Sequence, residues 1–234
     1  MVQEKIIARR DTTTRYSVVK KNLCTRGSLL GLFFVVTMFV AVVEGTLSPY
    51  SEEPLPSQAQ SLSERFEKRQ FMIPMRDGVL LNTEIYLPKV SLEPVPFLLT
   101  RTPYGLRHDE DGYHSSLGTA YAELASDGYI FVFQDIRGRY LSDGTFVMLR
   151  SQRRANELMA IDEGTDTYDT IEWLLKNIKG HTSRVGLLGI SYGGWLTVMG
   201  MLDPHPALGA ASPQASPADM FIGDDFLHNG ALRL

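Results

Sequence analysis

The sequence predicts an α/β fold: a mostly parallel, doubly wound sheet that is preceded by an antiparallel hairpin. Three observations lead to this fold class. Short apolar runs alternate with amphipathic helical segments over roughly 30 to 40 residues, which is typical of such sheets. An Asp-Gly step joins two strand-like runs near residue 77, a strong hairpin signal. A strand, a sharp turn and a helix follow one another around residue 191.

The stretch from Arg184 to Trp195 carries the clearest local signal. The apolar run 185–190 leads into Gly189-Ile190-Ser191-Tyr192-Gly193, which fits the G-x-S-x-G nucleophile elbow between a strand and a helix. Small residues are expected on both sides of the serine because the strand and helix backbones come close together there. Ser191 is therefore the candidate nucleophile, and the alternative reading is an ordinary glycine-rich turn.

The remaining elements follow from periodicity and turn signals. Strands are predicted at 71–75 and 79–87, joined by Arg76-Asp77-Gly78, and at 97–100, 129–134 and 207–211. One helix is predicted over 117–126, ending at Asp127-Gly128. A second helix runs from a Thr165 cap to about Asn177. Residues 135–160 are predicted to be irregular, and the loop 101–105 is marked because loops after strand ends carry function in open sheets.

The N-terminal part of the chain differs from the rest. Leu29–Val43 is an uninterrupted apolar or neutral run after a basic stretch, which predicts a signal peptide within residues 1–45 and export to the periplasm or the extracellular space. An uncleaved signal anchor is the alternative, and it would tether the protein to a membrane. Residues 46–66 are rich in Ser, Pro, Glu and Gln and are predicted to be a flexible linker before a domain over 67–234. The only cysteine, Cys24, lies before the apolar run.

Charge and composition limit the partners. Seven of the 23 basic and three of the 27 acidic residues lie in residues 1–45, so the remainder carries 16 basic and 24 acidic residues, a net charge of −8. A nucleic-acid partner is not expected, because phosphate binding needs a positive surface. The histidines are scattered and no cysteine cluster exists, so neither a metal site nor a cofactor is predicted.

A serine nucleophile needs a base, and in the elbow fold the acid and the histidine follow the serine in the chain. His205 and His228 are the two histidines after Ser191. His205 lies in a proline-rich turn at the end of the elbow helix and is expected on the wrong side of the sheet. His108, His114 and His181 precede the serine and are expected to be surface or loop residues.

Several ordered blocks resemble the α-amino-acid ester hydrolases, which belong with cocaine esterase, glutaryl-cephalosporin acylase and X-Pro dipeptidyl-peptidase relatives. The resemblance covers about residues 65–234. Its blocks are Met75–Leu81, Arg101–Tyr104, Phe133–Arg139, Asp162–Asp169, Gly189–Gly194, Leu202–Leu208 and Gly223–Ala231. It implies a partial α/β-hydrolase fold that is incomplete at its C-terminus, and a homo-oligomer for the complete enzyme.

The resemblance also implies roles for individual residues. Ser191 matches the nucleophile, and the backbone N–H of Tyr192 matches one half of the oxyanion hole. Tyr104 matches the tyrosine whose hydroxyl supplies the other half. Asp225 matches one member of the carboxylate cluster that binds the substrate's α-ammonium group, although Asp224 could face the pocket instead. Clustered carboxylates in a partly desolvated pocket attract a cation.

In the family, the triad aspartate and histidine, a helical cap and a C-terminal jelly-roll domain lie beyond the position that matches Leu234. The resemblance therefore implies an N-terminal fragment of a serine hydrolase for small α-amino esters or amides, including β-lactam side chains. A general carboxylesterase or an X-Pro dipeptidyl peptidase of the same fold is one alternative. A catalytically inactive fragment is the other.

Overall fold

The structure, a computed structural model, describes residues 61–154, 157, 160–218, 227–229 and 231–232. The predicted leader, the segment Leu29–Val43 and most of the predicted linker lie outside the described residues, as do Asp224 and Asp225. Within the part of the chain that is described, no helix has the length and apolar character needed to cross a membrane.

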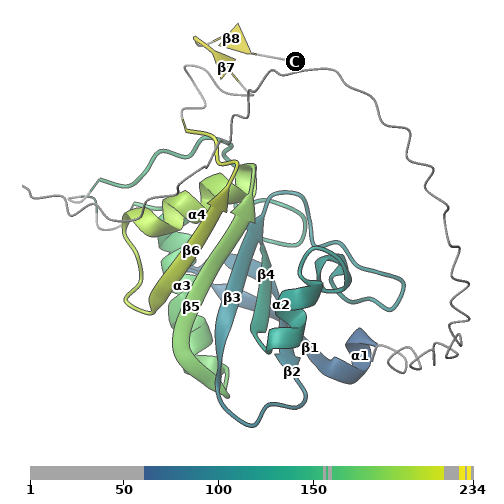
Figure 1. Cartoon of the computed structure of the whole chain (residues 1–234). Helices are drawn as coiled ribbons and strands as arrows, with labels where there is room; N and C mark the ends of the chain where they lie inside the picture. The colour runs from purple at the N-terminus through teal and green to yellow at the C-terminus, as the bar shows by residue number, and fades with distance from the viewer. Residues whose placement is uncertain (1–60, 155–156, 158–159, 219–226, 230, 233–234) are drawn as a thin grey trace, which may run out of the picture. The chain divides into compact units, whose positions relative to one another are not determined.

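Six strands form one mixed sheet in the order β1-β2-β4-β3-β5-β6 (Figure 1). Strands β1, β2 and β4 pair antiparallel, whereas β4, β3, β5 and β6 run parallel. The strands are β1 (Phe66–Pro74), β2 (Leu80–Pro88), β3 (Val95–Thr102), β4 (Ile130–Asp135), β5 (His181–Ile190) and β6 (Leu208–Gln214). The predicted hairpin therefore forms one edge of a mostly parallel sheet. We call the end at which β3, β4, β5 and β6 finish the carboxyl edge.

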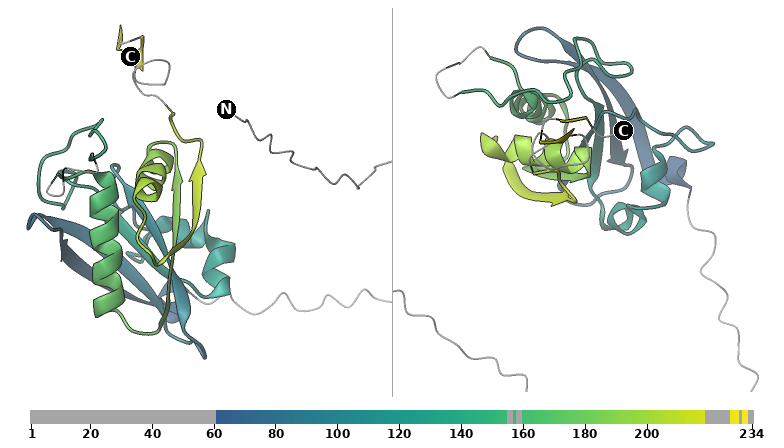
Figure 2. Two further views of the ribbon diagram at one scale, coloured as in Figure 1. Left: turned by 90° about the vertical axis from the view of Figure 1, so that its left-hand side faces the viewer. Right: turned by 90° about the horizontal axis from the view of Figure 1, so that it is seen from above.

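Helices cover both faces of the sheet, as Figure 2 shows. Helices α3 (Glu163–Asn177) and α4 (Tyr192–Leu202) lie together on one face. The 3₁₀-helix η1 (Ser115–Gly118) and α2 (Ala122–Asp127) lie on the other. The short α1 (Leu62–Arg65) precedes β1, and β7 (Leu227–His228) pairs with β8 (Ala231–Leu232) in a separate ladder. The doubly wound fold class predicted from the sequence is confirmed.

Two apolar clusters hold these layers together, one on each face, because successive side chains of a strand point to opposite faces. On one face Ile171 and Leu174 of α3 pack, fully buried, against Phe97 and Leu99 of β3. On the other face Phe131 and Phe133 of β4 pack against the buried Leu117 and Ala125, with Tyr86 beside them. β4 is buried along its whole length, as its continuous apolar run predicts.

The linker prediction was wrong at its C-terminal end. Ser61 caps α1 in a capping box with Glu64, and Phe66 begins β1 five residues before the predicted strand. The polar run after Phe66 forms a strand because each residue pairs with β2, from Phe66 opposite Pro88 onwards. An edge strand can leave polar side chains in water, so hydrophobic periodicity does not detect it.

Two helix predictions also need correction. The helix predicted over 117–126 is divided, because the backbone of Thr119 (φ −127°, ψ −98°) breaks it between η1 and α2. Gly128 ends α2 in the left-handed conformation (φ 83°), as predicted. Asp162 rather than Thr165 caps α3: the Asp162 carboxylate accepts from the Thr165 N–H, and the Thr165 hydroxyl accepts from the Asp162 N–H. Both residues favour caps, so the sequence alone does not separate them.

Buried ion pairs connect α3 to the sheet and to the hairpin. Arg137, just after β4, binds Asp166 of α3 through Nε and Nη2 at 3.1 and 2.7 Å. The same guanidinium binds Asp77 in the hairpin turn at 2.5 and 3.2 Å. Arg101 of β3 donates to the Glu163 carbonyl and to the Thr167 hydroxyl. Arg137 and Arg101 therefore organise the base of the carboxyl edge.

His114 lies in the loop before η1, one of the two positions expected for it, but it is buried rather than at the surface. The residue is 8% exposed, and its ring stacks flat on Phe133 with centroids 3.6 Å apart. Burial lowers the pKa of His114 to about 4, against the opposing effect of the nearby Glu84 carboxylate. Because the folded pKa lies below the unfolded value of about 6.5, the unfolded chain binds the proton first. The stability that neutral His114 provides is therefore complete above about pH 6.5 and declines toward pH 4.

We expect this decline to reach about 2 to 3 kcal/mol at pH 4.5. In the folded protein, His114 Nδ1 accepts a hydrogen bond from the Ser116 N–H. In the His114→Asn variant, the asparagine side chain can accept the same hydrogen bond but does not titrate. Urea unfolding at pH 7.0 and 4.5 should therefore show a smaller pH-dependent loss for His114→Asn than for the unsubstituted chain. An equal loss of stability between pH 7.0 and 4.5 in both proteins would contradict the attribution of that loss to His114.

Candidate functional site: a nucleophile elbow at the carboxyl edge

Ser191 stands at the turn between β5 and α4, at the carboxyl edge. Its backbone has φ 58° and ψ −121°, a conformation that non-glycine residues rarely adopt. The Ser191 N–H donates to the carbonyl of Gln214 at the end of β6, and the Ser191 carbonyl accepts from Trp195 in the first turn of α4. The residue is exposed to solvent. The strand, the helix and the neighbouring strand thus fix a strained turn with the serine on its outside.

The close approach of strand and helix requires two glycines, but not the two that the sequence pattern suggests. A Cβ on Gly189 would lie 2.1 Å from the Gly193 carbonyl oxygen, and one on Gly194 would lie 2.4 Å from the Gln214 carbonyl oxygen. Both distances are far below the van der Waals contact distance, so a side chain does not fit at either position. A Cβ on Gly193 would meet nothing closer than the Arg101 carbonyl at 3.6 Å. Small residues are therefore needed on both sides of the serine, as expected, but on the helix side the required glycine is Gly194 rather than Gly193.

Tyr104 lies on the loop that leaves the carboxyl edge next to Ser191. β3 and β5 are adjacent and parallel, with Leu99 opposite Leu187, and both strands end at the carboxyl edge. Tyr104 follows Thr102 by two residues, and its N–H donates to the Thr102 hydroxyl at 3.1 Å. The Tyr104 side chain is 50% exposed. The structure thus brings Tyr104 and Ser191 to neighbouring positions on one edge.

Tyr192 is the first residue of α4, where the positive end of the helix dipole lies. Its phenol is buried and donates to the Met148 carbonyl at 2.6 Å. Burial raises the pKa of Tyr192, and the nearby Glu163 and Tyr104 groups raise it further. The side chain of Tyr192 is thereby kept neutral and held at the Met148 carbonyl. Its backbone N–H lies at this helix N-terminus, a position at which negative charge is favoured.

His205 lies away from Ser191, as expected. It follows α4 and precedes β6, so it sits at the end of the sheet opposite the carboxyl edge. Its Nε2 contacts Glu172 at 2.9 Å, and its Nδ1 accepts from the Ala207 N–H at 3.0 Å. Both ring nitrogens of His205 therefore have partners, which indicates a structural role for its side chain. Nothing is described of the His228 side chain, and the candidate substrate residues Asp224 and Asp225 lie outside the described residues.

Residues that the sequence reasoning missed lie on the loop after β4. Arg139 donates from Nε to the Pro103 carbonyl at 2.8 Å, next to Tyr104. The Tyr140 ring lies against Gly105. The sequence of this segment predicts only irregular structure. The segment follows a strand that ends at the carboxyl edge, and in open α/β sheets that position alone indicates a functional loop. Among the described residues, no group of three or more His, Cys, Asp or Glu side chains is arranged to hold a metal ion.

Comparisons with known proteins agree with this geometry. Residues 77–234 match the X-Pro dipeptidyl-peptidase (S15) family. Cocaine esterase from Rhodococcus sp. (strain MB1 Bresler) is 34% identical over 161 residues, which cover 69% of this chain and 25% of the esterase. This similarity extends over most of the described domain.

Two solved structures are similar at 40% identity. One is an α-amino acid ester hydrolase labelled with selenomethionine, with a TM-score of 0.65 over 80% of this chain and 31% of that one. The other is an aminopeptidase from the marine sediment archaeon Thaumarchaeota archaeon, with a TM-score of 0.64 over 80% of this chain and 32% of that one. The chain thus spans a quarter to a third of the length of these relatives, which share its fold over the matched region.

Proposed function

Because the chain belongs to the X-Pro dipeptidyl-peptidase (S15) family, whose matched relatives are hydrolases, we propose that it supplies the nucleophile and the oxyanion hole of a serine hydrolase. The observation that carries the proposal is the backbone of Ser191. An exposed serine at φ 58° and ψ −121° between a parallel strand and a helix is strained, and such strain is stored where function uses it. The alternative of an ordinary glycine-rich turn does not explain this conformation.

The proposed reaction proceeds through an acyl-serine. The Ser191 Oγ attacks the substrate carbonyl carbon, a base takes the Oγ proton, and the carbonyl oxygen becomes an oxyanion. The Tyr192 N–H and the Tyr104 hydroxyl donate to that oxygen from α4 and from the loop after β3. The carbon–oxygen or carbon–nitrogen bond then breaks, and the alcohol or amine leaves with the proton. Water then attacks the acyl carbonyl carbon, the bond from that carbon to Ser191 Oγ breaks, Oγ takes up a proton, and the acid is released.

The proposed substrates are small α-amino acid esters or amides, including β-lactam side chains. In support, both solved relatives at 40% identity are named for action on amino acid esters or at amino termini. Asp225, or Asp224 beside it, is the proposed partner of the substrate's α-ammonium group. Cocaine esterase, at 34% identity, favours the alternative of a general carboxylesterase. The family itself favours the alternative of an X-Pro dipeptidyl peptidase.

A fluorophosphonate probe tests the nucleophile directly. We expect the purified chain to be labelled at Ser191, as located by mass spectrometry of the tryptic peptide, and the Ser191→Ala chain to remain unlabelled. Labelling should be fast only if a base lies beside the hydroxyl, because in a triad the base activates the serine. Labelling at another serine, or none after prolonged incubation of a folded chain, would reject the nucleophile and leave the inactive alternative.

Removal of the Tyr104 hydroxyl should slow the same reaction. A donor aimed at the developing oxyanion contributes about 3 kcal/mol, so Tyr104→Phe should lower the rate of Ser191 labelling by about a hundredfold. Tyr113→Phe is a matched control, because that hydroxyl donates to Phe66 next to α1, away from the carboxyl edge. Equal rates for Tyr104→Phe and the control would exclude Tyr104 from the oxyanion hole.

The substrate class has its own test. If Asp225 binds an ammonium group, Asp225→Asn should reduce labelling by a phosphonate that carries an α-amino group by about tenfold or more, and should leave the N-acetylated phosphonate unaffected. Asp224→Asn is the paired variant, because either carboxylate could face the pocket. A uniform effect on both probes in both variants would favour a general esterase.

A further inference from the structure

The loop that carries Tyr104 is held by two residues of the segment after β4. Arg139 is half-buried, and its Nε donates to the carbonyl of Pro103, the residue before Tyr104, at 2.8 Å. The Arg139 guanidinium lies over two aromatic rings, 5.3 Å from the centroid of Tyr140 and 5.1 Å from that of Phe146. Such stacking holds the planar group in one orientation, which a lysine could not reproduce.

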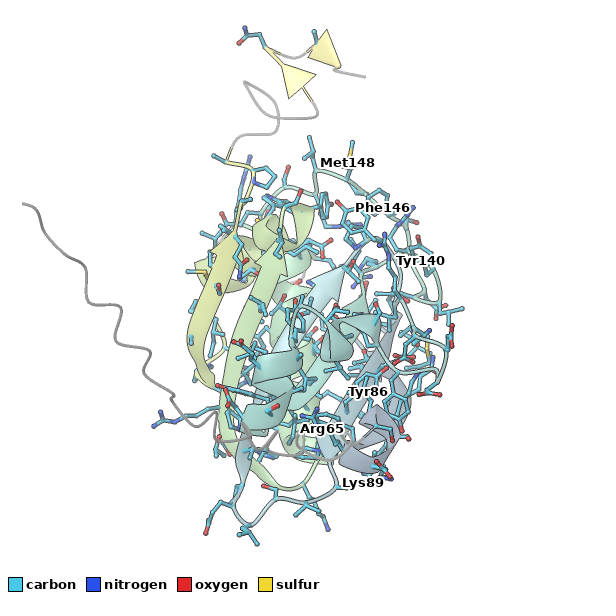
Figure 3. All side chains as sticks on the ribbon, turned by 45° about the vertical axis from the view of Figure 1, so that its right-hand side comes forward. Arg65, Tyr86, Lys89, Tyr140, Phe146 and Met148 are labelled. Atoms are coloured by element: carbon cyan, nitrogen blue, oxygen red, sulfur yellow. The ribbon has the colours of Figure 1, made fainter. Side chains whose placement is uncertain are left out.

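The second contact lies on the other side of Tyr104. Gly105 has φ 83°, and the position that a Cβ would take there is 2.7 to 2.9 Å from three atoms of the Tyr140 ring. The ring therefore rests on the glycine backbone in the space of a missing side chain. Figure 3 shows Tyr140, Phe146 and Met148 at the same end of the protein. Tyr104 is thus bracketed by a bond to the residue before it and a ring on the residue after it.

The conformation of Tyr140 has no explanation in its own packing. Its φ is 49°, which is uncommon for a residue with a large side chain, and 64% of the residue is exposed. Burial of the ring thus does not account for the left-handed backbone. What the conformation achieves is the placement of the ring over Gly105 and beside Arg139. Strained backbones of this kind persist where surrounding contacts impose them, often at functional sites.

We propose that Arg139 and Tyr140 are positioning residues that hold the Tyr104 hydroxyl at the oxyanion hole. The inference rests on the proposed role of Tyr104 and adds the two groups that set its position. Tyr104 itself is half exposed, so its own packing does not fix it. An oxyanion donor acts only when it is pre-organised, and a displacement of about 1 Å can reduce a rate by about a hundredfold.

The position of Tyr104 can be measured without any reaction. We would place 3-fluorotyrosine at residue 104 by stop-codon suppression and record its ¹⁹F resonance in the full chain. Arg139→Met removes the bond to Pro103, and Tyr140→Gly removes the ring while accepting the left-handed backbone. Each should shift, split or broaden the resonance. Arg107→Met, an exposed arginine on the same loop, should leave the resonance unchanged. An unchanged resonance in both Arg139→Met and Tyr140→Gly would overturn the proposal.

The catalytic consequence is measured by a double-mutant cycle on fluorophosphonate labelling. Arg139→Met should slow labelling of Ser191 by about tenfold or more when Tyr104 is present, and by less than about twofold in the Tyr104→Phe background. A purely structural role would slow both backgrounds equally, and that result would overturn the proposal. If Ser191 is not labelled at all, the proposed function fails, while the ¹⁹F experiment still decides whether Arg139 and Tyr140 set the position of Tyr104.

Discussion

Replacement of Gly189 by alanine is expected to lower the free energy of unfolding by more than about 4 kcal/mol. The new methyl group would lie 2.1 Å from the oxygen and 2.3 Å from the carbon of the Gly193 carbonyl, and 2.8 Å from the Thr197 hydroxyl. A carbonyl of the helix backbone cannot rotate away as a side chain can. The strand and the helix would have to separate, which would disrupt the packing of α4 on β5.

Gly193→Ala is the matched control for Gly189→Ala. It adds the same methyl group to the same motif, but its nearest neighbour is 3.6 Å away, and alanine favours a helix over glycine by about 0.8 to 1 kcal/mol. Gly193→Ala should therefore unfold in urea at the same midpoint as the unsubstituted chain or at a higher one. Equal midpoints for the two variants would show that the elbow is less tightly packed than described.

The second large effect is expected at Arg137. This guanidinium is 5% exposed and makes four bonds to the carboxylates of Asp166 and Asp77. Arg137→Met would fill a similar volume but leave the Asp166 carboxylate, 2% exposed, without its closest partner. A buried charge that loses its partner typically destabilises a protein by about 3 to 5 kcal/mol. The hairpin turn and the start of α3 should loosen together.

Arg76 provides the comparison within the same hairpin. Its guanidinium binds Asp169 at 2.8 Å, but 30% of the side chain is exposed to solvent. Solvent screens such a pair, so Arg76→Met should lower the unfolding free energy by about 1 kcal/mol or less. Both variants would be measured by urea denaturation at pH 7 and several salt concentrations. A loss for Arg137→Met as small as that for Arg76→Met would show that Asp166 is adequately solvated.

Much of the fold could be predicted because its signals are local. The Asp-Gly turn predicts the hairpin, and the continuous apolar run around Phe133 predicts a strand buried on both faces. What could not be predicted depends on contacts distant in sequence. The polar residues after Phe66 form a strand only because β2 lies beside them. The burial of His114 depends on Phe133, which is 19 positions away in the printed sequence.

In the candidate site, too, local sequence signals predict some residues, whereas others depend on contacts distant in sequence. Ser191 could be predicted because a strand, a turn and a helix that are consecutive in sequence build the elbow. The proposed role of Tyr104 rests on the family resemblance alone, because its neighbour at the edge, Ser191, is 87 positions further along the chain. Gly194 could not be identified as essential, since the carbonyl that excludes a side chain there belongs to Gln214 of β6. Arg139 gives no local sign that it binds Pro103.

The first described helix, α1, and the elbow lie at opposite ends of the sheet. Ser63 and Arg65 of α1 bond to Lys89, beside the beginning of the parallel strands, and Figure 3 places Arg65 and Lys89 far from Met148. A protein immobilised on a bead or sensor chip through Ser61 would therefore present Ser191 to the solution. The support would then lie at the end of the sheet opposite the elbow.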